Sequence, residues 1–306
     1  MKIAIIGLGG VGGTVAGGFK EYEKDLIFVA RGETKKVLQA NGLYLESKVL
    51  GNKHIQPSLV SDDPKEIGIV DVVFLCCKAY GLESCCKSYG DIIGENTVVI
   101  PLVNGVVGRR MVEQYLGGKG IVTESYIYCF SNILEVGKVS NVGDGLFIGI
   151  GFSDGTTNET AEKVAEILTK GGLRTTYGKD IMTALWKKYS VVGANSCVFI
   201  YYDCIMGDVQ QSPERLEYLR NVSEDIIRLA TASGVTGLEG VVDKNMKDLM
   251  KLPPQSMTSL YRDLKAGKTD TEFEWLIGSG CQMAKELGIK VPYMDMAYGK
   301  KEYYQK

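Results

Sequence analysis

The chain has 306 residues, of which 45% are hydrophobic and 24% charged, so it is long enough to bury the cores of two domains. Its 35 basic and 37 acidic residues give a formal net charge of −2, which provides no overall field for attracting nucleic acid or an anionic membrane. No apolar run approaches the roughly 18 residues of a membrane span. We therefore expect a cytoplasmic protein, monomeric or homodimeric, whose partner is a small molecule.

The first predicted element is a buried strand, "KIAII", that runs into a glycine turn and then a helix beginning near Val11. The turn reads G-x-G-x-x-G, a pattern that allows a tight turn, close approach of a pyrophosphate, and close packing of helix on strand. The N-terminus of the helix offers unpaired N–H groups and a partial positive charge to phosphates. The sequence thus predicts a dinucleotide site made by Gly7, Leu8, Gly9, Gly10, Val11 and Gly12.

The second predicted strand, "LIFVA", ends where the choice of nucleotide is made. A site for NAD usually places an acidic residue there to bind the ribose 2′-hydroxyl. This chain has Arg31 instead, nineteen residues after Gly12. A guanidinium suits a 2′-phosphate that a carboxylate would repel, so we expect NADP(H) as the cofactor. The alternative is a solvated surface arginine.

The rest of the first half alternates between short apolar runs and helical segments. The apolar runs are "DVVFLCC", "TVVIPLV" and "GIVTESYIYC", and a stretch at 136–149 reads as a hairpin added to the sheet. Strands that alternate with helices indicate a mostly parallel sheet of the α/β class, and continuous apolar runs indicate helices on both faces. We predict a Rossmann-type NADP(H)-binding domain over residues 1–178.

Beyond Gly178 the strand signals nearly vanish and helical patterns dominate. "IMTALWKKYSVVGANSCVFI" is apolar nearly all round and predicts a buried helix. The next helix has Ser212 as its N-cap, Pro213 at its first position and Gly234 at its end, and a last long helix stops at Gly288. We predict an all-α domain over residues 179–306 that binds the substrate and carries the catalytic groups.

The eight cysteines include two doublets, Cys76-Cys77 and Cys85-Cys86. No C-x-x-C spacing occurs, and the chain has a single histidine, His54, so we expect no metal site. The thiols are interpreted as reduced and buried, because free cysteine behaves as a small hydrophobe. His54 lies in a stretch typical of a short surface strand and is interpreted as a bystander.

Several motifs in this order resemble the ketopantoate reductase (2-dehydropantoate 2-reductase) family over essentially the whole chain. Besides the glycine turn and Arg31, the matching pieces are "CCKAY" with Lys78, "LVNGV" with Asn104, "ALWKK" with Lys188, and "TSLYRDLKAGKTDTEFEWLIG" with Ser259, Asp263 and Glu272. The resemblance implies NADPH-dependent reduction of 2-dehydropantoate to pantoate, on the route to pantothenate and coenzyme A. Two alternatives stay open: a related NADP-dependent reductase of another 2-oxo acid, and a non-catalytic NADP(H)-binding sensor.

The resemblance also implies roles for individual residues. Lys188 would donate a hydrogen bond to the substrate carbonyl and then a proton to the alkoxide, and burial in its apolar helix would lower its pKa. Glu272 would contact the substrate hydroxyl and balance the lysine. Lys78 would bind the cofactor, Asn104 the cofactor and substrate, and Ser259 the substrate carboxylate. Lys187 would point about 100° away from Lys188 and be solvated.

Two positions depart from the family pattern. One helical turn after the lysine the family usually has asparagine, and this chain has Val192, with Asn195 and Ser196 nearby. The asparagine usually found just ahead of the serine is also missing in "PPQSMTS". The loss of hydrogen-bonding groups changes the preferred substrate more readily than the reaction type. These departures bear on the identity of the oxo acid.

Overall fold

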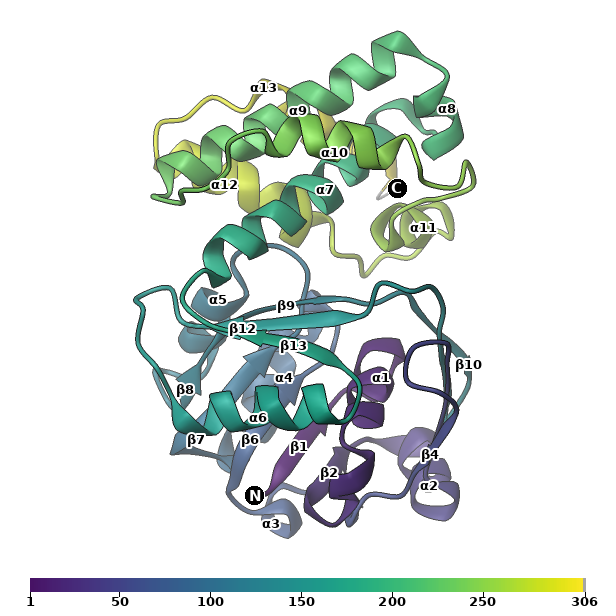
Figure 1. The fold of residues 1–306 in the computed structure, drawn as a ribbon, viewed down its shortest axis with the longest axis vertical. Coiled ribbons are helices and arrows are strands. Elements are labelled where there is room, and N and C mark those ends of the chain that lie inside the picture. Colours follow the sequence, from purple (N-terminus) through teal and green to yellow (C-terminus); the bar gives the residue numbers. More distant parts are fainter. Residues whose placement is uncertain (305–306) are drawn as a thin grey trace. The chain divides into compact units, whose positions relative to one another are not determined.

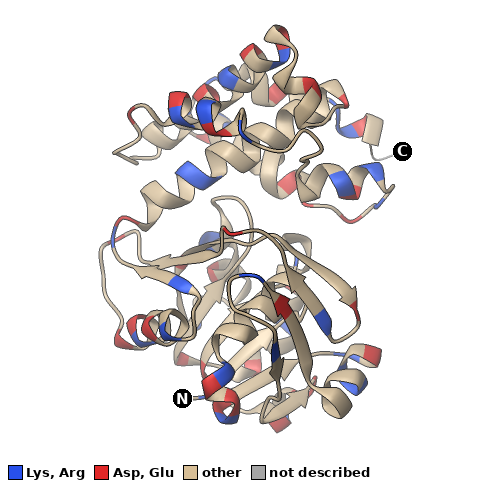
Figure 2. Ribbon diagram, turned by 45° about the vertical axis from the view of Figure 1, so that its right-hand side comes forward, with Lys and Arg blue, Asp and Glu red and all other residues tan. Residues whose placement is uncertain are grey.

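The structure is a computed structural model that describes residues 1–304, and these form two compact units. Unit 1 consists of Met1–Val103 and Gly108–Ile181, and unit 2 consists of Asn104–Val107 and the chain from Met182 onward. Unit 1 holds all the strands, and unit 2 is helical (Figure 1). Basic and acidic residues are interspersed along the chain in both units (Figure 2). None of the helices in the described part of the chain combines the length and apolar character needed to cross a bilayer.

The core of unit 1 is a six-stranded, all-parallel sheet with the order β5-β2-β1-β6-β7-β8. Its strands are β1 (Ile3–Ile6), β2 (Leu26–Val29), β5 (Leu59–Ser61), β6 (Val70–Leu75), β7 (Ile93–Pro101) and β8 (Ile121–Val122). Strands β1 and β2 are buried at every position, which explains their unbroken apolar runs. The strand order reverses beside β1, where a doubly wound sheet binds its ligand. The predicted fold class is confirmed.

Helices connect these strands. They are α1 (Gly10–Gly18), α2 (Gly32–Asn41), α3 (Pro64–Ile67), α4 (Leu82–Tyr89) and α5 (Gly108–Tyr115), with short 3-10 helices η1 (Lys20–Asp25), η2 (Ala79–Gly81) and η3 (Gly90–Ile92). Helix α1 also packs on a second sheet: a Cβ at Gly13 would lie 2.6 Å from Val139 Cγ2. Glycine at this position therefore allows a close helix–sheet contact that the sequence did not reveal.

The predicted hairpin at 136–149 is wrong, because the second sheet contains a hairpin with different bounds. Strands β10 (Ser131–Glu135) and β11 (Lys138–Asn141) form the antiparallel hairpin, turning at Gly137 with φ +80°, and β11 also pairs with β3 (Leu43–Ser47) beside β4 (Lys53–Ile55). The glycines at 143 and 145 instead lead out of this sheet to β12 (Phe147–Gly151). Two glycine-containing turns lay within the stretch, and the pattern did not show which one closed a hairpin.

A third sheet has the order β13-β12-β9, and helix α6 (Glu159–Lys170) connects β12 to β13. Its other strands are β9 (Glu124–Tyr128) and β13 (Arg174–Tyr177). The single strand predicted from "GIVTESYIYC" is therefore wrong, since β8 and β9 belong to different sheets. The break falls at Thr123, whose N–H donates to Val99 O at 2.9 Å.

Unit 2 is built around α7 (Ile181–Tyr202), which is the buried helix that the sequence predicts. The other helices are α8 (Met206–Gln210), α9 (Pro213–Ala232), α10 (Val241–Leu249), α11 (Ser259–Lys265), the π-helical segment η4 (Glu274–Gly278), α12 (Ser279–Glu286), α13 (Pro292–Tyr298) and α14 (Lys301–Tyr304). The predicted caps of α9 are confirmed: Ser212 Oγ accepts from Arg215 N at 3.3 Å, and Gly234 has φ +83°. Gly288, with φ +67°, follows α12 as predicted.

Helix α13 is capped by a residue far away in the chain. Its own N-cap, Val291, has no side-chain acceptor, and the Asp225 carboxylate on α9 accepts from Tyr293 N at 2.8 Å and from Met294 N at 3.2 Å. Arg228 Nη1 donates to the other Asp225 oxygen at 2.8 Å. The Asp225 side chain is only 1% exposed, so this cap is a buried, charged link between two helices.

Candidate functional site

The glycine turn of unit 1 has the backbone geometry that a dinucleotide requires. Gly7 has φ +93°, and a Cβ on it would lie 2.9 Å from Cys77 N, while a Cβ on Gly12 would overlap Gly7 O. Helix α1 begins at Gly10, and its N-cap Gly9 has no side chain to cap the first turn. The N–H groups of this turn are therefore uncapped by a side chain, as a phosphate-binding helix terminus requires.

Arg31 lies at the same edge of the sheet as the glycine turn. Strands β1 and β2 are parallel with Ile6 beside Val29, so the segments that follow them leave the sheet together. Arg31 is exposed at the N-cap position of α2. A carboxylate, Asp62, lies close enough for Arg31 to contribute to lowering its pKa, although the main cause is a hydrogen bond from Lys35 at 2.6 Å. Lys35 thus offsets the negative charge of Asp62 near Arg31.

Lys78 follows β6, on the other side of β1. The register places Ile6 beside Leu75, so Lys78 is carried to the edge that holds the glycine turn. Its side chain is half-buried, and its backbone leads into η2 with φ −64° and ψ 150°. The structure therefore gathers the predicted cofactor residues of unit 1 at one edge of one sheet.

In unit 2 the structure brings Lys188 and Asn104 together although 84 residues separate them. Lys188 Nζ donates to Asn104 Oδ1 at 2.9 Å, and Lys188 is only 5% exposed. Asn104 lies on the loop after β7, where Gly105 has φ +90° and a Cβ would come within 3.1 Å of Trp275 O. Lys187 is exposed, as predicted from its position on α7.

Glu272 is 3% exposed and lies two residues before η4, and its carbonyl accepts from Leu276 N at 2.9 Å. The residue before it, Thr271, is also buried, and its Oγ1 has no hydrogen-bond partner among the described residues. Ser259 is half-buried in the first turn of α11. The distance from Ser259 to Lys188 depends on how α11 packs against α7. A hydrogen bond between two hydroxyl groups connects α7 to the N-cap of α11.

That hydroxyl pair consists of Ser196 Oγ and Thr258 Oγ1, 3.2 Å apart. Ser196 and Asn195 come two helical turns after Lys188 and Val192 one turn after it, so all lie on the lysine's side of α7. Val192 is half-buried, and Asn195 is 7% exposed with an Oδ1 that has no partner among the described residues. Sequence reasoning named Asn195 and Ser196 as nearby but missed Thr258 and Thr271, for which it held no signal beyond residue type.

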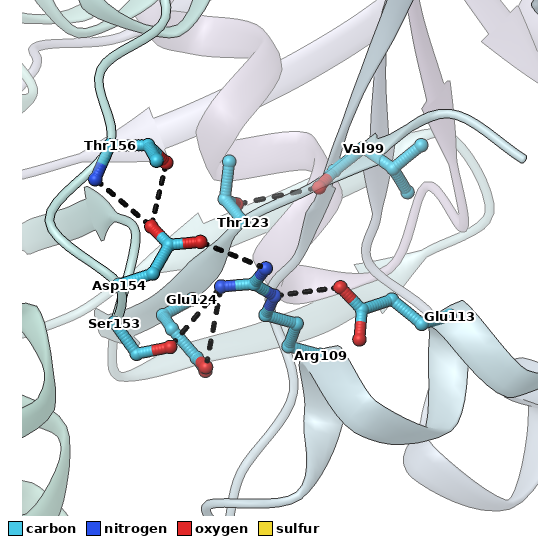
Figure 3. Close-up of polar contacts among 8 residues, drawn as sticks. All are labelled: Val99, Arg109, Glu113, Thr123, Glu124, Ser153, Asp154 and Thr156. Carbon is cyan, nitrogen blue, oxygen red and sulfur yellow. Dashed lines mark hydrogen bonds and ion pairs between the residues drawn. The ribbon is translucent and has the colours of Figure 1, made fainter. Parts of the chain in front are cut away.

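The loop that carries Asn104 continues into α5, which a charged network holds in place (Figure 3). Arg109 donates to Glu113 Oε1 at 2.8 Å and to Ser153 Oγ at 3.2 Å, and it lies 4.0 Å from Glu124 and 3.8 Å from Asp154. Burial raises the pKa of Glu124. The network fixes α5 against β9 and the segment before α6, and no sequence pattern had indicated it.

The other predicted features have local roles. His54 is exposed on β4, as predicted, where its ring stacks on Tyr44 and Nε2 lies 2.7 Å from Asn41 O. All eight cysteines are free. The prediction that they are buried is wrong for five of them, because Cys76, Cys77, Cys85, Cys129 and Cys281 are half-buried. These side chains lie at strand ends and on helix faces that reach the surface.

A parallel sheet with a glycine turn at its switch point, joined to a helical unit with a buried lysine, is the architecture of a dinucleotide-dependent oxidoreductase. Two family models match the chain: "Ketopantoate reductase PanE/ApbA" over residues 3–151, and its C-terminal counterpart over residues 180–301. The chain belongs to the ketopantoate reductase family. The 2-dehydropantoate 2-reductases of this family are NADP-dependent oxidoreductases, and this chain is an oxidoreductase with NADP(H) as its cofactor.

Individual relatives are distant but cover nearly the whole chain. An uncharacterized oxidoreductase, YkpB, of Bacillus subtilis is 24% identical, covering 100% of this chain and 99% of its own. A 2-dehydropantoate 2-reductase of Archaeoglobus fulgidus is 27% identical over 94% of this chain and 92% of its own.

Solved structures share the fold. A crystal structure of 2-dehydropantoate 2-reductase from Methylococcus capsulatus has a TM-score of 0.89 at 20% identity, covering 99% of this chain and 96% of that one. D-mandelate dehydrogenase in a ternary structure with NADH and anilino(oxo)acetate has a TM-score of 0.83 at 17% identity, covering 100% and 98%.

Proposed function

We propose that this enzyme reduces a 2-oxo acid to the 2-hydroxy acid with NADPH, and that 2-dehydropantoate is its substrate, giving pantoate for pantothenate and coenzyme A synthesis. The observation that carries the proposal is the hydrogen bond from Nζ of the buried Lys188 to Oδ1 of the half-buried Asn104. An ammonium held at a fixed point by an amide, away from bulk water, is the group that reduction of a carbonyl requires.

The proposed chemistry follows from charge. NADPH, held by the glycine turn, Arg31 and Lys78, would supply a hydride. When the carbonyl carbon of the substrate accepts it, negative charge develops on the oxygen. Lys188 would donate a hydrogen bond to that oxygen and then transfer a proton from Nζ, while Asn104 fixes the position of the ammonium.

Two further residues complete the proposed site. The buried Glu272 carboxylate would balance the lysine charge and accept from the product hydroxyl. Ser259, the first residue of α11 after its N-cap Thr258, would donate to the substrate carboxylate. In this scheme unit 1 binds the cofactor and unit 2 supplies the proton donor and the substrate contacts.

Replacing Lys188 by alanine tests this scheme most directly. We expect kcat for 2-dehydropantoate, followed by NADPH absorbance, to fall by roughly 10²–10⁴-fold, the usual contribution of a positioned proton donor. Lys187→Ala is the matched control, because it removes the neighbouring, exposed ammonium and should leave kcat unchanged. Turnover by Lys188→Ala at the rate of the unaltered enzyme would exclude the proposed role.

A second candidate substrate is another 2-oxo acid, and Val192 favours it. This half-buried apolar side chain stands one turn from Lys188, where an amide is usual in the family. An apolar wall there suits a hydrocarbon substituent better than a hydroxylated one. The same assay with phenylglyoxylate, 2-oxoisovalerate and pyruvate distinguishes the two: a higher kcat/KM for one of these than for 2-dehydropantoate would establish the second reading. Tight NADPH binding with no turnover of any oxo acid would contradict both.

A further inference from the structure

The two cysteine doublets place one thiol from each next to the other in unit 1. Cys77 follows β6, and its Sγ lies 4.0 Å from the position that a Cβ on Gly81 would occupy. Gly81 comes one helical turn before Cys85, so Cys85 lies on the face of α4 toward which Cys77 points. The two thiols lie close enough for each to shift the pKa of the other, and both side chains are half-buried rather than sealed from solvent.

The surroundings make the two thiols unequal. The neighbouring Cys77 thiol and, further, the positive charge of Arg31 lower the pKa of Cys85 to about 7, against the opposing effect of burial. The interaction with Cys85, together with burial, raises the pKa of Cys77. Cys86 and Tyr89 on the same helix are titratable groups near Cys85, and burial raises the pKa of each. The shifts therefore favour the thiolate at Cys85 and the protonated thiol at Cys77.

We propose that Cys85 and Cys77 form a redox-active pair that a hydroperoxide oxidises to a disulfide. The Cys85 thiolate attacks the peroxide, the O–O bond breaks, and Cys85 becomes a sulfenic acid with release of hydroxide. Cys77 then attacks the Cys85 sulfur, and the proton of Cys77 and the hydroxyl of the sulfenic acid leave as water. Over the two steps the thiols lose two hydrogen atoms, and hydrogen peroxide is reduced to two molecules of water.

The proposal explains why Cys85 reacts and Cys77 resolves, since a low-pKa, accessible thiol beside a protonated partner is the arrangement of redox-sensing cysteines. It does not depend on which oxo acid the enzyme reduces. A lone thiolate at this place would go on to irreversible oxidation, and the neighbouring thiol provides the reversible route.

To test the proposal, the reduced 306-residue protein is treated with hydrogen peroxide and digested with trypsin under non-reducing conditions. The products are then mapped by mass spectrometry. Cleavage after Lys78 and Lys87 separates the two doublets, so the expected product is a pair of peptides joined by a bond between Cys77 and Cys85 and released by dithiothreitol. The rate of its formation should rise between pH 6 and 8, because the thiolate is the form that attacks the peroxide and its fraction increases with pH.

Variants decide which atoms react. Cys77→Ser should keep a dimedone-reactive sulfenic acid at Cys85 and form no bond between the peptides, whereas Cys85→Ser should lose both. Cys86→Ser, one position along, and Cys281→Ser, on α12, are controls that should retain the bond. A Cys76–Cys77 disulfide, a bond that persists in Cys85→Ser, or a rate that does not change between pH 6 and 8 would overturn the proposal. Fragmentation of the peptides from the unaltered protein gives the same answer if a variant does not fold.

Discussion

At the scale of single residues, we expect the Arg31 side chain to determine the preference for NADPH over NADH. Arg31→Asp should weaken NADPH binding by roughly 10- to 100-fold, the equivalent of a lost charge-assisted hydrogen bond, and leave NADH binding much less affected. Dissociation constants from nucleotide fluorescence measure both. Lys36→Asp makes the same charge change at an exposed site on the same helix and should affect the two nucleotides equally. An equal loss for both nucleotides in Arg31→Asp would refute the assignment.

Glu124 gives a prediction about pH. Because burial raises the pKa of Glu124 in the folded protein, the folded state holds a proton that the unfolded state releases. Uptake of this proton stabilises the folded state at low pH. The stabilisation is lost as pH rises from the ordinary glutamate range through the raised pKa of Glu124. Glu124→Gln keeps the shape and removes the titration, so its melting temperature relative to the unaltered protein should increase across that interval. A constant difference between the two proteins at all pH values would contradict this reasoning.

Site residues whose role depends on local structure could be predicted from the sequence, and those whose role depends on long-range packing could not. Gly7 and Arg31 were readable because a backbone turn and a strand end impose local requirements. The pairing of Lys188 with Asn104 came from family resemblance, since no local pattern joins residues 84 positions apart. Thr258 and Thr271 could not be singled out, because burial of a hydroxyl depends on how distant helices pack.

At the scale of elements, helix α13 depends on a residue that its own sequence does not contain. Asp225→Ala would leave two N–H groups of α13 and the Arg228 guanidinium without their buried acceptor. We expect a loss of about 3–5 kcal/mol in the free energy of unfolding, measured with urea. Asp243→Ala, which breaks the exposed pair with Arg220, should lose less than about 1 kcal/mol. Equal losses would mean that the Asp225 cap is not a stabilising link.

Elements with strong local signals were predicted well. Helices α7 and α9 follow from apolar periodicity and from the Ser212, Pro213 and Gly234 signals. The pairing of β10 with β11 did not follow, because register depends on which of two glycine turns folds back and on the packing of β11 against α1. Alternation of strand and helix was enough to predict the parallel sheet, and it carried no information about the two smaller sheets.

At the scale of the whole molecule, the two units have separate hydrophobic cores that share no residue. Both tryptophans, Trp186 and Trp275, belong to unit 2, so their fluorescence reports on that unit. We expect calorimetry to resolve two thermal transitions, one of which coincides with the change in fluorescence. NADPH at about 100 times its dissociation constant should stabilise the other transition by about 2.7 kcal/mol. Coincident transitions that move together would show that the chain unfolds as one cooperative body.

The loop Asn104–Val107 has a practical consequence for anyone who dissects this gene. Although strands and helices of unit 1 flank it in the chain, it belongs with the helices: Asn104 binds Lys188, and Val106 packs on the unit 2 core. A fragment of residues 1–181 would expose Val106 to water. The remaining fragment, which begins at Met182, would contain Lys188 without Asn104, its hydrogen-bond partner. Each half would thus lack a part encoded in the other, and co-expression rather than separate purification is the sensible route to studying them.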